Sequence, residues 1–326
     1  MNTNARIATV CQGNSFCRTI AGNRQYILKI LHQVFLQKPD LVCLPEAFTV
    51  KGVPLESLEE AAEPVPGPTL DLLAGLAKEN RCYIICPIYT KRDEKFRNSA
   101  VVIDRRGEIA GIYDKVHPAA TSYDYTVFEN GVTPGEGSPV FDLDFGRIGI
   151  QICLDARFPA EWQKMAKKGV KAVFWPAAYN GGLMLPGYAS LFHYYVISSV
   201  RTDKARIINP CGEIVSETSP GVNYAVANIN FDFIAAGVEF NHSIPRQISK
   251  KYPHQVQVRL YPDQGTFLVE PLDKGITVQQ LQKEFAFEPL SQFILRHQKS
   301  YRQIQKGIAP VPQEALHGSR PCQEKD

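Results

Sequence analysis

The hydrophobic positions alternate along the chain between short apolar runs and helical stripes. Apolar runs typical of buried strands stand in the segments "RIATVCQ" (Arg6 to Gln12), "DLVCLPE" and "RCYIICPIY". The segment from Asn23 to Leu36 instead carries an apolar residue every three or four positions, which predicts a helix, and Leu70 to Asn80 predicts another. Strands alternating with helices predict an α/β protein.

The middle of the chain continues this alternation. A hairpin turning at Arg106 and Gly107 and a strand pair turning near Phe145 and Gly146 are predicted first. The elements expected after them are a helix over Glu161 to Lys168, a strand in "VKAVFWPAA", a helix through "YASLFHYYVISSVR", and two last clear strands in "ARIINPCGEIVSET" and "NYAVANINFDF".

The pattern weakens from about Ala235. The segment "LSQFILRHQKSYRQI" has Leu290, Phe293, Ile294 and His297 on one face, which predicts an amphipathic helix. The last residues are polar and proline-rich, as in disordered tails. We therefore expect one large domain over residues 1–290, followed over 291–326 by a helix and a disordered tail.

Composition excludes several classes of function. The 326 residues are 44% hydrophobic and 21% charged, with a net charge of +3, which is too small to indicate a nucleic-acid partner. The sequence has no apolar run long enough for a membrane span, and no secretory leader is expected. Four of the eight cysteines, Cys11, Cys43, Cys86 and Cys153, lie in or at the ends of apolar runs, which favours a reducing compartment, the cytoplasm. Their spacing predicts no metal site.

Three polar residues stand at the ends of predicted strands. Glu46 follows "LVCLP", Lys115 follows "IAGIY" and Cys153 follows "IGIQI". Strand ends are where α/β proteins usually carry their active sites. A thiol, a carboxylate and an ammonium together can attack a carbonyl carbon, move its protons and stabilise the resulting oxyanion.

The residues around these three positions resemble the nitrilase superfamily of carbon–nitrogen hydrolases. The matching segments are "DLVCLPEAF", "GEIAGIYDKVHP" and "GRIGIQICLDARFPAE", supported by "PVPGP", "RNSAVVID" and "ENGVTPGEG". The resemblance covers about residues 6–233 and implies a four-layer α-β-β-α sandwich of two mixed sheets. It also implies a small-molecule substrate, no cofactor, and a homodimer or larger homo-oligomer. We expect the helix of about Pro159 to Lys168 at the dimer face, because Trp162 and Met165 would be partly exposed in a monomer.

The resemblance further implies a mechanism for hydrolysing a small amide or N-carbamoyl compound. Cys153 attacks the carbonyl carbon, Glu46 transfers protons, and Lys115 with the backbone N–H of Leu154 holds the oxyanion, so that a thioester forms and is hydrolysed. The helix after Cys153 and the charge of Lys115 are expected to favour the thiolate.

Other residues receive roles on the same resemblance. Glu129 is the candidate for a second glutamate that orients Lys115 or substrate. His117 is expected to be structural, and Asp155 and Arg157 to form an ion pair. The strand end "FWPAAYNGG" is expected to line the pocket through Trp175, Ala178 and Tyr179, although Trp175 is equally interpretable as core. The short link "RTDK" departs from related sequences and predicts a different site rim.

Two alternatives stay open at this point. The same three residues could transfer the acyl group to an amine instead of water, or the fold could serve as a non-catalytic scaffold. A papain-like protease using His193 is disfavoured, because no local motif matches that class and Lys115 would have no role.

Overall fold

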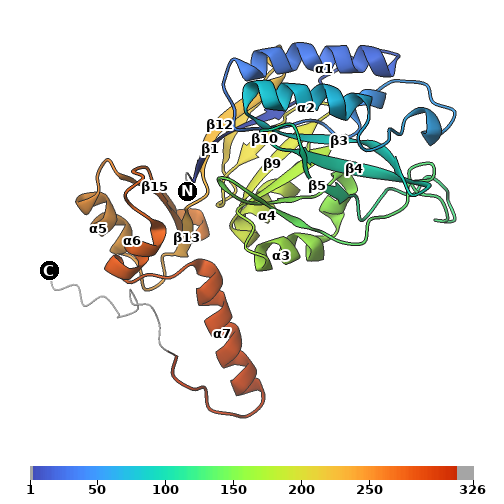
Figure 1. The fold of residues 1–326 in the computed structure, drawn as a ribbon. Helices are drawn as coiled ribbons and strands as arrows, with labels where there is room; N and C mark the ends of the chain where they lie inside the picture. Colours follow the sequence, from blue (N-terminus) through green and yellow to red (C-terminus); the bar gives the residue numbers. More distant parts are fainter. Residues whose placement is uncertain (1–2, 314–326) are drawn as a thin grey trace.

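The computed structural model describes residues 3–313, and two six-stranded sheets form its body (Figure 1). The first sheet has the order β12-β1-β2-β3-β4-β5 and the second β11-β10-β9-β8-β7-β6. Both are mixed, since β1, β2 and β3 pair in parallel, as do β7, β8 and β9, while the other pairings are antiparallel. The expected α-β-β-α sandwich is confirmed.

The first sheet and its helices come mainly from the N-terminal part of the chain. The strands are β1 (Asn4–Val10), β2 (Leu41–Cys43), β3 (Tyr83–Arg92), β4 (Lys95–Ile103) and β5 (Ile109–Asp114), joined by β12 (Tyr224–Asn230). The helices α1 (Ile20–Phe35) and α2 (Pro68–Asn80) cover its outer face through their apolar stripes. The β4–β5 turn uses Gly107, whose φ of +82° and closeness to the Ala74 carbonyl leave no room for a side chain.

The second sheet is built from the middle of the chain. Its strands are β6 (Val140–Leu143), β7 (Gly146–Ile150), β8 (Ala172–Ala177), β9 (Tyr195–Val200), β10 (Arg206–Ile208) and β11 (Ile214–Glu217). The helices α3 (Pro159–Lys167) and α4 (Met184–Phe192) cover its outer face. The inner faces of the two sheets share one core, which includes Ile7, Cys43, Ile85, Ile148, Phe174 and Ile197.

One predicted helix is partly wrong. The helix expected through "YASLFHYYVISSVR" ends at Phe192, and His193 caps it in the left-handed conformation with a φ of 54°. The following residues 195–200 form the fully buried strand β9. A strand buried on both faces shows an unbroken apolar run, which periodicity alone does not separate from a helix.

The C-terminal region contains strands that the sequence pattern did not reveal. The strands β13 (Ile234–Gly237), β14 (Val256–Tyr261) and β15 (Thr266–Pro271) form a three-stranded sheet in the order β13-β15-β14. The helices α5 (Ile244–Lys251) and α6 (Val278–Phe285) pack on it around a separate small core that includes Ile248, Phe267 and Leu281. Figure 1 shows this small C-terminal unit beside the body formed by the two six-stranded sheets. The predicted boundary at residue 290 stays a prediction, and the predicted tail beyond 313 lies outside the described residues.

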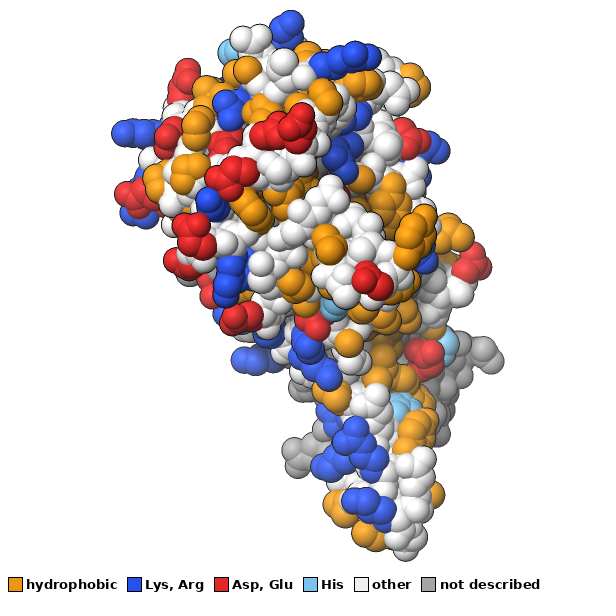
Figure 2. Space-filling model, turned by 90° about the vertical axis from the view of Figure 1, so that its right-hand side faces the viewer, with side chains coloured by type: hydrophobic (Ala, Val, Ile, Leu, Met, Phe, Trp, Pro, Cys, Tyr) orange, Lys and Arg blue, Asp and Glu red, His pale blue; other side chains and the backbone are white. Residues whose placement is uncertain are grey.

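The predicted amphipathic helix is present as α7 (Leu290–Gln305), which projects from the small C-terminal unit. None of its residues is buried. Figure 2 shows Lys and Arg side chains gathered on this projection, with hydrophobic side chains along its edge. Within residues 3–313, no helix is both long and apolar enough to cross a membrane.

The physical reason given for a dimer face on α3 is wrong. Trp162 and Met165 are fully buried within a single chain, in the core between α3, α4 and the second sheet. These two side chains therefore leave no apolar surface for a partner chain to cover. The expectation of a homo-oligomer has to rest on other observations.

Candidate active site

The candidate site lies where strands from both sheets end. Glu46 follows β2 and Cys153 follows β7, and both strands belong to the parallel part of their sheets. Lys115 follows β5, which runs in the same direction as β3 because two antiparallel pairings separate them. The three residues therefore meet at one end of the sandwich, as expected for an α/β active site.

Lys115 is held between two carboxylates. Its Nζ lies 2.8 Å from Glu46 Oε1 and 2.5 Å from Glu129 Oε1, and its side chain is only 1% exposed. The Asn98 side-chain amide also donates to both carboxylates, at 3.0 Å to Glu46 and 2.9 Å to Glu129. The structure thus brings Glu129, the candidate second glutamate, into direct contact with the lysine that it was expected to orient.

The loop carrying Glu129 is fixed by its own backbone. The Glu129 N–H donates to the Ala119 carbonyl at 2.7 Å, and the Ala119 N–H donates to the Glu129 carboxylate at 3.2 Å. Glu129 and Asn130 both adopt positive φ values, of 40° and 57°, which non-glycine residues seldom do. Such strain tends to persist at functional sites.

Burial and charge set the protonation of the two acidic groups. Burial acts to raise the pKa of the Glu46 carboxyl, but the charges of Lys115 and Arg201, with hydrogen bonds from Lys115 and Asn98, hold that pKa below its ordinary value. Burial likewise raises the pKa of the Cys153 thiol, to about 12, and the charge of Glu46 adds to this more strongly than Lys115 opposes it. Burial and the charge of Glu46 thus oppose the expected thiolate and favour a protonated sulfur in the resting protein.

Cys153 occupies a strained corner of the backbone. Its φ is 48°, and it begins a short 3₁₀ turn over Cys153–Arg157 that precedes α3, so Leu154 lies within that turn. The Trp175 indole donates to the Cys153 carbonyl at 3.0 Å. This hydrogen bond holds the corner from the side of β8.

The residues expected to line the pocket differ in their exposure. Trp175 is fully buried and belongs to the core beneath the second sheet, so it supports the Cys153 turn from below. The Ala178 backbone hydrogen-bonds the Cys153 thiol. Tyr179 is partly exposed, packs edge-on against Trp175 at 5.2 Å, and its hydroxyl pKa is raised by burial and by the nearby Cys153. Ala178 and Tyr179 therefore lie near the sulfur.

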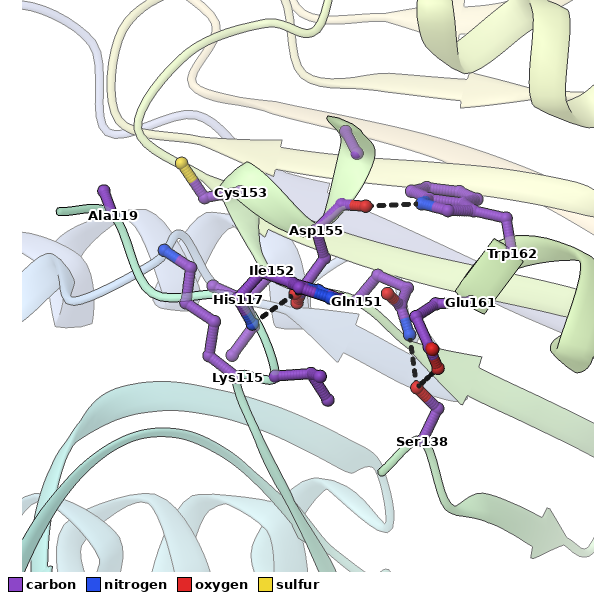
Figure 3. Close-up of polar contacts among 12 residues, drawn as sticks. Lys115, His117, Ala119, Ser138, Gln151, Ile152, Cys153, Asp155, Glu161 and Trp162 are labelled. Carbon is purple, nitrogen blue, oxygen red and sulfur yellow. Dashed lines mark hydrogen bonds and ion pairs between the residues drawn. The ribbon is translucent and has the colours of Figure 1, made fainter. Parts of the chain in front are cut away.

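The expected ion pair between Asp155 and Arg157 is wrong. Asp155 is fully buried, and its carboxylate instead lies 2.8 Å from His117 Nδ1. His117 is therefore held by a carboxylate, in agreement with the structural role expected of it. Figure 3 shows this contact beside Lys115 and Cys153.

Two residues in the site had no role assigned from the sequence. Asn98 lies in the segment "RNSAVVID", where a polar side chain inside a buried strand was the available signal. Arg201 follows β9 in the unusually short link, and its Nη2 lies 4.0 Å from Glu46 Oε2. Thr202, Asp203 and Lys204 beyond it border a cavity of about 580 Å³ that reaches Cys11 and Asn223.

Among the described residues 3–313, no three His, Cys, Asp or Glu side chains are grouped as a metal ion would require. Lys115 instead supplies the positive charge next to Glu46 and Cys153.

Comparisons with known proteins agree with this geometry. The family model described as carbon–nitrogen hydrolase matches residues 7–237. The omega-amidase NIT2-B of Xenopus laevis is 27% identical over 242 residues, which span 67% of this chain and 85% of that protein. The beta-ureidopropionase of Arabidopsis thaliana is 31% identical over 175 residues, which span 49% of this chain and 42% of that protein.

Solved structures show the same fold. Nit3 of Saccharomyces cerevisiae, described as a member of branch 10 of the nitrilase superfamily, superposes with a TM-score of 0.60 at 22% identity, covering 70% of this chain and 90% of that chain. An amidase from Nesterenkonia sp. gives a TM-score of 0.60 at 19% identity, covering 71% and 92%. With the family model spanning most of the described body, the chain belongs to the carbon–nitrogen hydrolases of the nitrilase superfamily, enzymes that act on non-peptide bonds.

Proposed function

We propose that this enzyme hydrolyses a small amide or N-carbamoyl compound through a thioester on Cys153, with Glu46 as general base and acid and Lys115 as the oxyanion-stabilising cation. The observation that supports this most is the position of the Lys115 ammonium, within 2.8 Å of Glu46 Oε1 and electrostatically coupled to the Cys153 thiol. The nucleophile Cys153, the base Glu46 and the charged Lys115 are then close enough to act on one bound substrate.

The protonation states define the first step. The Cys153 thiol holds its proton and Glu46 is ionised, so Glu46 accepts that proton as sulfur attacks the carbonyl carbon. The carbonyl oxygen becomes an oxyanion, which Lys115 and the backbone N–H of Leu154 stabilise. A protonated sulfur in the resting site avoids an isolated thiolate in a buried environment, which would be costly.

The remaining steps return the site to its starting state. Glu46 passes its proton to the leaving nitrogen as the carbon–nitrogen bond breaks, which leaves the acyl group on Cys153 as a thioester. Glu46 then takes a proton from water, whose oxygen attacks the thioester carbon. Breaking the carbon–sulfur bond releases the acid, and the proton on Glu46 returns to the sulfur.

Glu129 is proposed as the residue that holds Lys115 in place during this cycle. Its carboxylate bonds the Lys115 ammonium independently of Glu46, and the Asn98 amide donates to both carboxylates. Lys115 is therefore positioned even when Glu46 carries the transferred proton. Ala178 and Tyr179 are proposed to contact the substrate, because they lie near the sulfur at the end of β8.

The test is a panel of small amides, nitriles and N-carbamoyl compounds assayed for ammonia or amine release. We expect turnover of at least one amide or carbamoyl compound, with none in Cys153→Ala. Cys82→Ala is the matched control, because Cys82 is also a free cysteine but is fully buried just before β3, where it bonds the Tyr83 carbonyl. Turnover that survives Cys153→Ala would contradict the proposal.

Hydroxylamine added to the same reactions separates hydrolysis from acyl transfer. A hydrolase releases mainly the free acid, whereas preferential formation of the hydroxamate over the acid, at hydroxylamine far below the concentration of water, would favour acyl transfer to amines.

We also propose a cytoplasmic homo-oligomer. The support for assembly is the unburied helix α7, where Ile294, Tyr301 and Ile304 are exposed. The support for the compartment is that the described cysteines are free thiols, most of them buried as small hydrophobic side chains. Light scattering at micromolar concentration that finds only monomer would contradict the assembly, and cell fractionation tests the compartment.

A further inference from the structure

The Asp155 carboxylate is the most heavily bonded acidic group near the site, and the proposed mechanism does not use it. It is fully buried in the turn that starts at Cys153. Its Oδ2 accepts from the Tyr113 hydroxyl at 2.6 Å and from the Ile152 N–H at 2.8 Å. Its Oδ1 accepts from the His117 N–H at 2.9 Å and lies 2.8 Å from His117 Nδ1 (Figure 3).

These partners come from two different sheets. Tyr113 and His117 lie two residues before and two residues after Lys115, at the end of β5 in the first sheet. Ile152 immediately precedes Cys153, after β7 in the second sheet. One carboxylate thus joins the backbone that carries the lysine to the backbone that carries the nucleophile.

We infer that Asp155 is a positioning residue that fixes the distance between the Lys115 ammonium and the Cys153 sulfur, an inference that rests on the proposed function of those two residues. The first sheet holds Lys115 and the second holds Cys153, and no strand pairing joins β5 to β7. The hydrogen bonds of Asp155 supply a polar link between them at the level of the reacting atoms.

The chemistry of the partners suits this role. Burial first, and then the charge of Asp155 with its hydrogen bond, raise the pKa of the Tyr113 hydroxyl well above its ordinary value, so Tyr113 remains a donor at neutral pH. The Tyr113 oxygen lies 3.4 Å from the N–H of Val116, the residue that follows Lys115. The bond from the Ile152 N–H also restrains the corner at which Cys153 takes its positive φ.

Asp155→Asn tests the inference, because the amide keeps the size of the side chain but offers a donor in place of one oxygen. We expect kcat to fall by about tenfold to a hundredfold with KM little changed, since small displacements of reacting groups have effects of this size. The substrate is the compound of the panel that wild type turns over fastest.

Alkylation of Cys153 by iodoacetamide provides the second measurement. Sulfur bonds the methylene carbon, iodide leaves, and Glu46 takes the thiol proton, so no oxyanion forms and Lys115 is not required. We therefore expect Asp155→Asn to be alkylated at nearly the wild-type rate, measured by mass spectrometry on the peptide containing Cys153. A residue that only maintained the fold would slow turnover and alkylation together.

Glu161→Gln is the matched control. Glu161 is also a buried carboxylate near Asp155, but it bonds Ser138 at 3.0 Å and Lys164 at 2.6 Å, and contacts neither strand end of the site (Figure 3). We expect its kcat to stay near wild type. Asp155→Asn turnover equal to that of Glu161→Gln, or an equal loss of turnover and alkylation, would overturn the inference.

A milder variant keeps the test decisive if Asp155→Asn does not fold. Tyr113→Phe removes the two hydrogen bonds of the Tyr113 hydroxyl, to Asp155 and from the Val116 N–H, but leaves those that His117 makes to Asp155. We expect a severalfold loss of kcat with KM unchanged. Unchanged kcat in Tyr113→Phe would then overturn the inference. Turnover retained in Cys153→Ala would instead show that the proposed function itself is wrong, so the two failures are distinguishable.

Discussion

Replacing Lys115 by glutamine removes the buried positive charge that bonds Glu46 and Glu129. The ammonium is almost fully buried between Glu46 and Glu129, and Asn98 is then the main donor left to both carboxylates. Removing one donor to a developing oxyanion typically costs about 2.7–4 kcal/mol, or a hundredfold to a thousandfold in rate. We expect Lys115→Gln to lose kcat by at least this factor.

The same substitution alters the pH dependence and the stability. The charge of Lys115 lowers the pKa of Glu46, so its removal raises that pKa and moves the acidic limb of the kcat/KM profile to higher pH. Two buried carboxylates then lose the cation that bonds both of them, although Arg201 remains 4.0 Å from Glu46. Breaking a buried ion pair in this way costs on the order of 3–5 kcal/mol of folding free energy.

The assay is a pH profile of kcat/KM for wild type, Lys115→Gln and Lys115→Arg, recorded well below each unfolding midpoint. Lys115→Arg should fail nearly as badly, because a planar guanidinium does not place a compact charge at the same point. Lys171→Gln is the control, since Lys171 is partly buried and its ammonium contacts the carbonyl and the ring of Phe233, at 3.4 Å and 4.6 Å, rather than a group of the site. Lys115→Gln turnover within about tenfold of wild type would refute the role of the charge.

Three further predictions concern other parts of the structure. Glu129→Gln should lower kcat by about tenfold to a hundredfold while iodoacetamide still labels Cys153, because it loosens Lys115 but leaves the thiol and its base in place. The pKa of Glu46 is lowered on folding, so its ionisation stabilises the protein above the ordinary glutamate pKa of about 4.3. That contribution is lost as the pH falls through the pKa of Glu46 in the folded protein. Urea unfolding should therefore find Glu46→Gln more destabilising at pH 7 than at acidic pH. A chain ending after residue 290 should keep the turnover of the full chain in the amide assay, because no side chain of α7 is buried within one chain. A large loss of turnover would contradict the predicted boundary.

The sequence was most informative at the positions where a polar residue directly follows a predicted strand. Glu46, Lys115 and Cys153 each follow an apolar run, and the structure places all three at one end of the sandwich. The two-sheet architecture followed from the resemblance, because the spacing of apolar runs does not say which strands share a sheet. Glu129 was harder to place, since it lies in an irregular loop whose positive φ values no sequence pattern indicates.

The errors arose where tertiary contacts decide the outcome. Asp155 was paired with Arg157, whereas the side chains that it contacts, His117 and Tyr113, lie 38 and 42 residues away, at the end of a strand of the other sheet. Trp162 was expected at a surface because an amphipathic stripe does not say whether the protein's own sheet or a second chain covers it. The Cys153 thiol was expected to ionise from its helix and lysine neighbours, but its burial and the charge of Glu46 outweigh them.

The central claim is that Cys153 carries the acyl group during turnover. Wild type is mixed with its best amide substrate, quenched in acid within one turnover, digested, and its cysteine peptides are weighed by mass spectrometry, with Cys153→Ala treated alike. We predict an added mass equal to the acyl group on the peptide containing Cys153, absent from the variant and removed by hydroxylamine. An acyl group on any other cysteine, or undiminished turnover in Cys153→Ala, would contradict the mechanism.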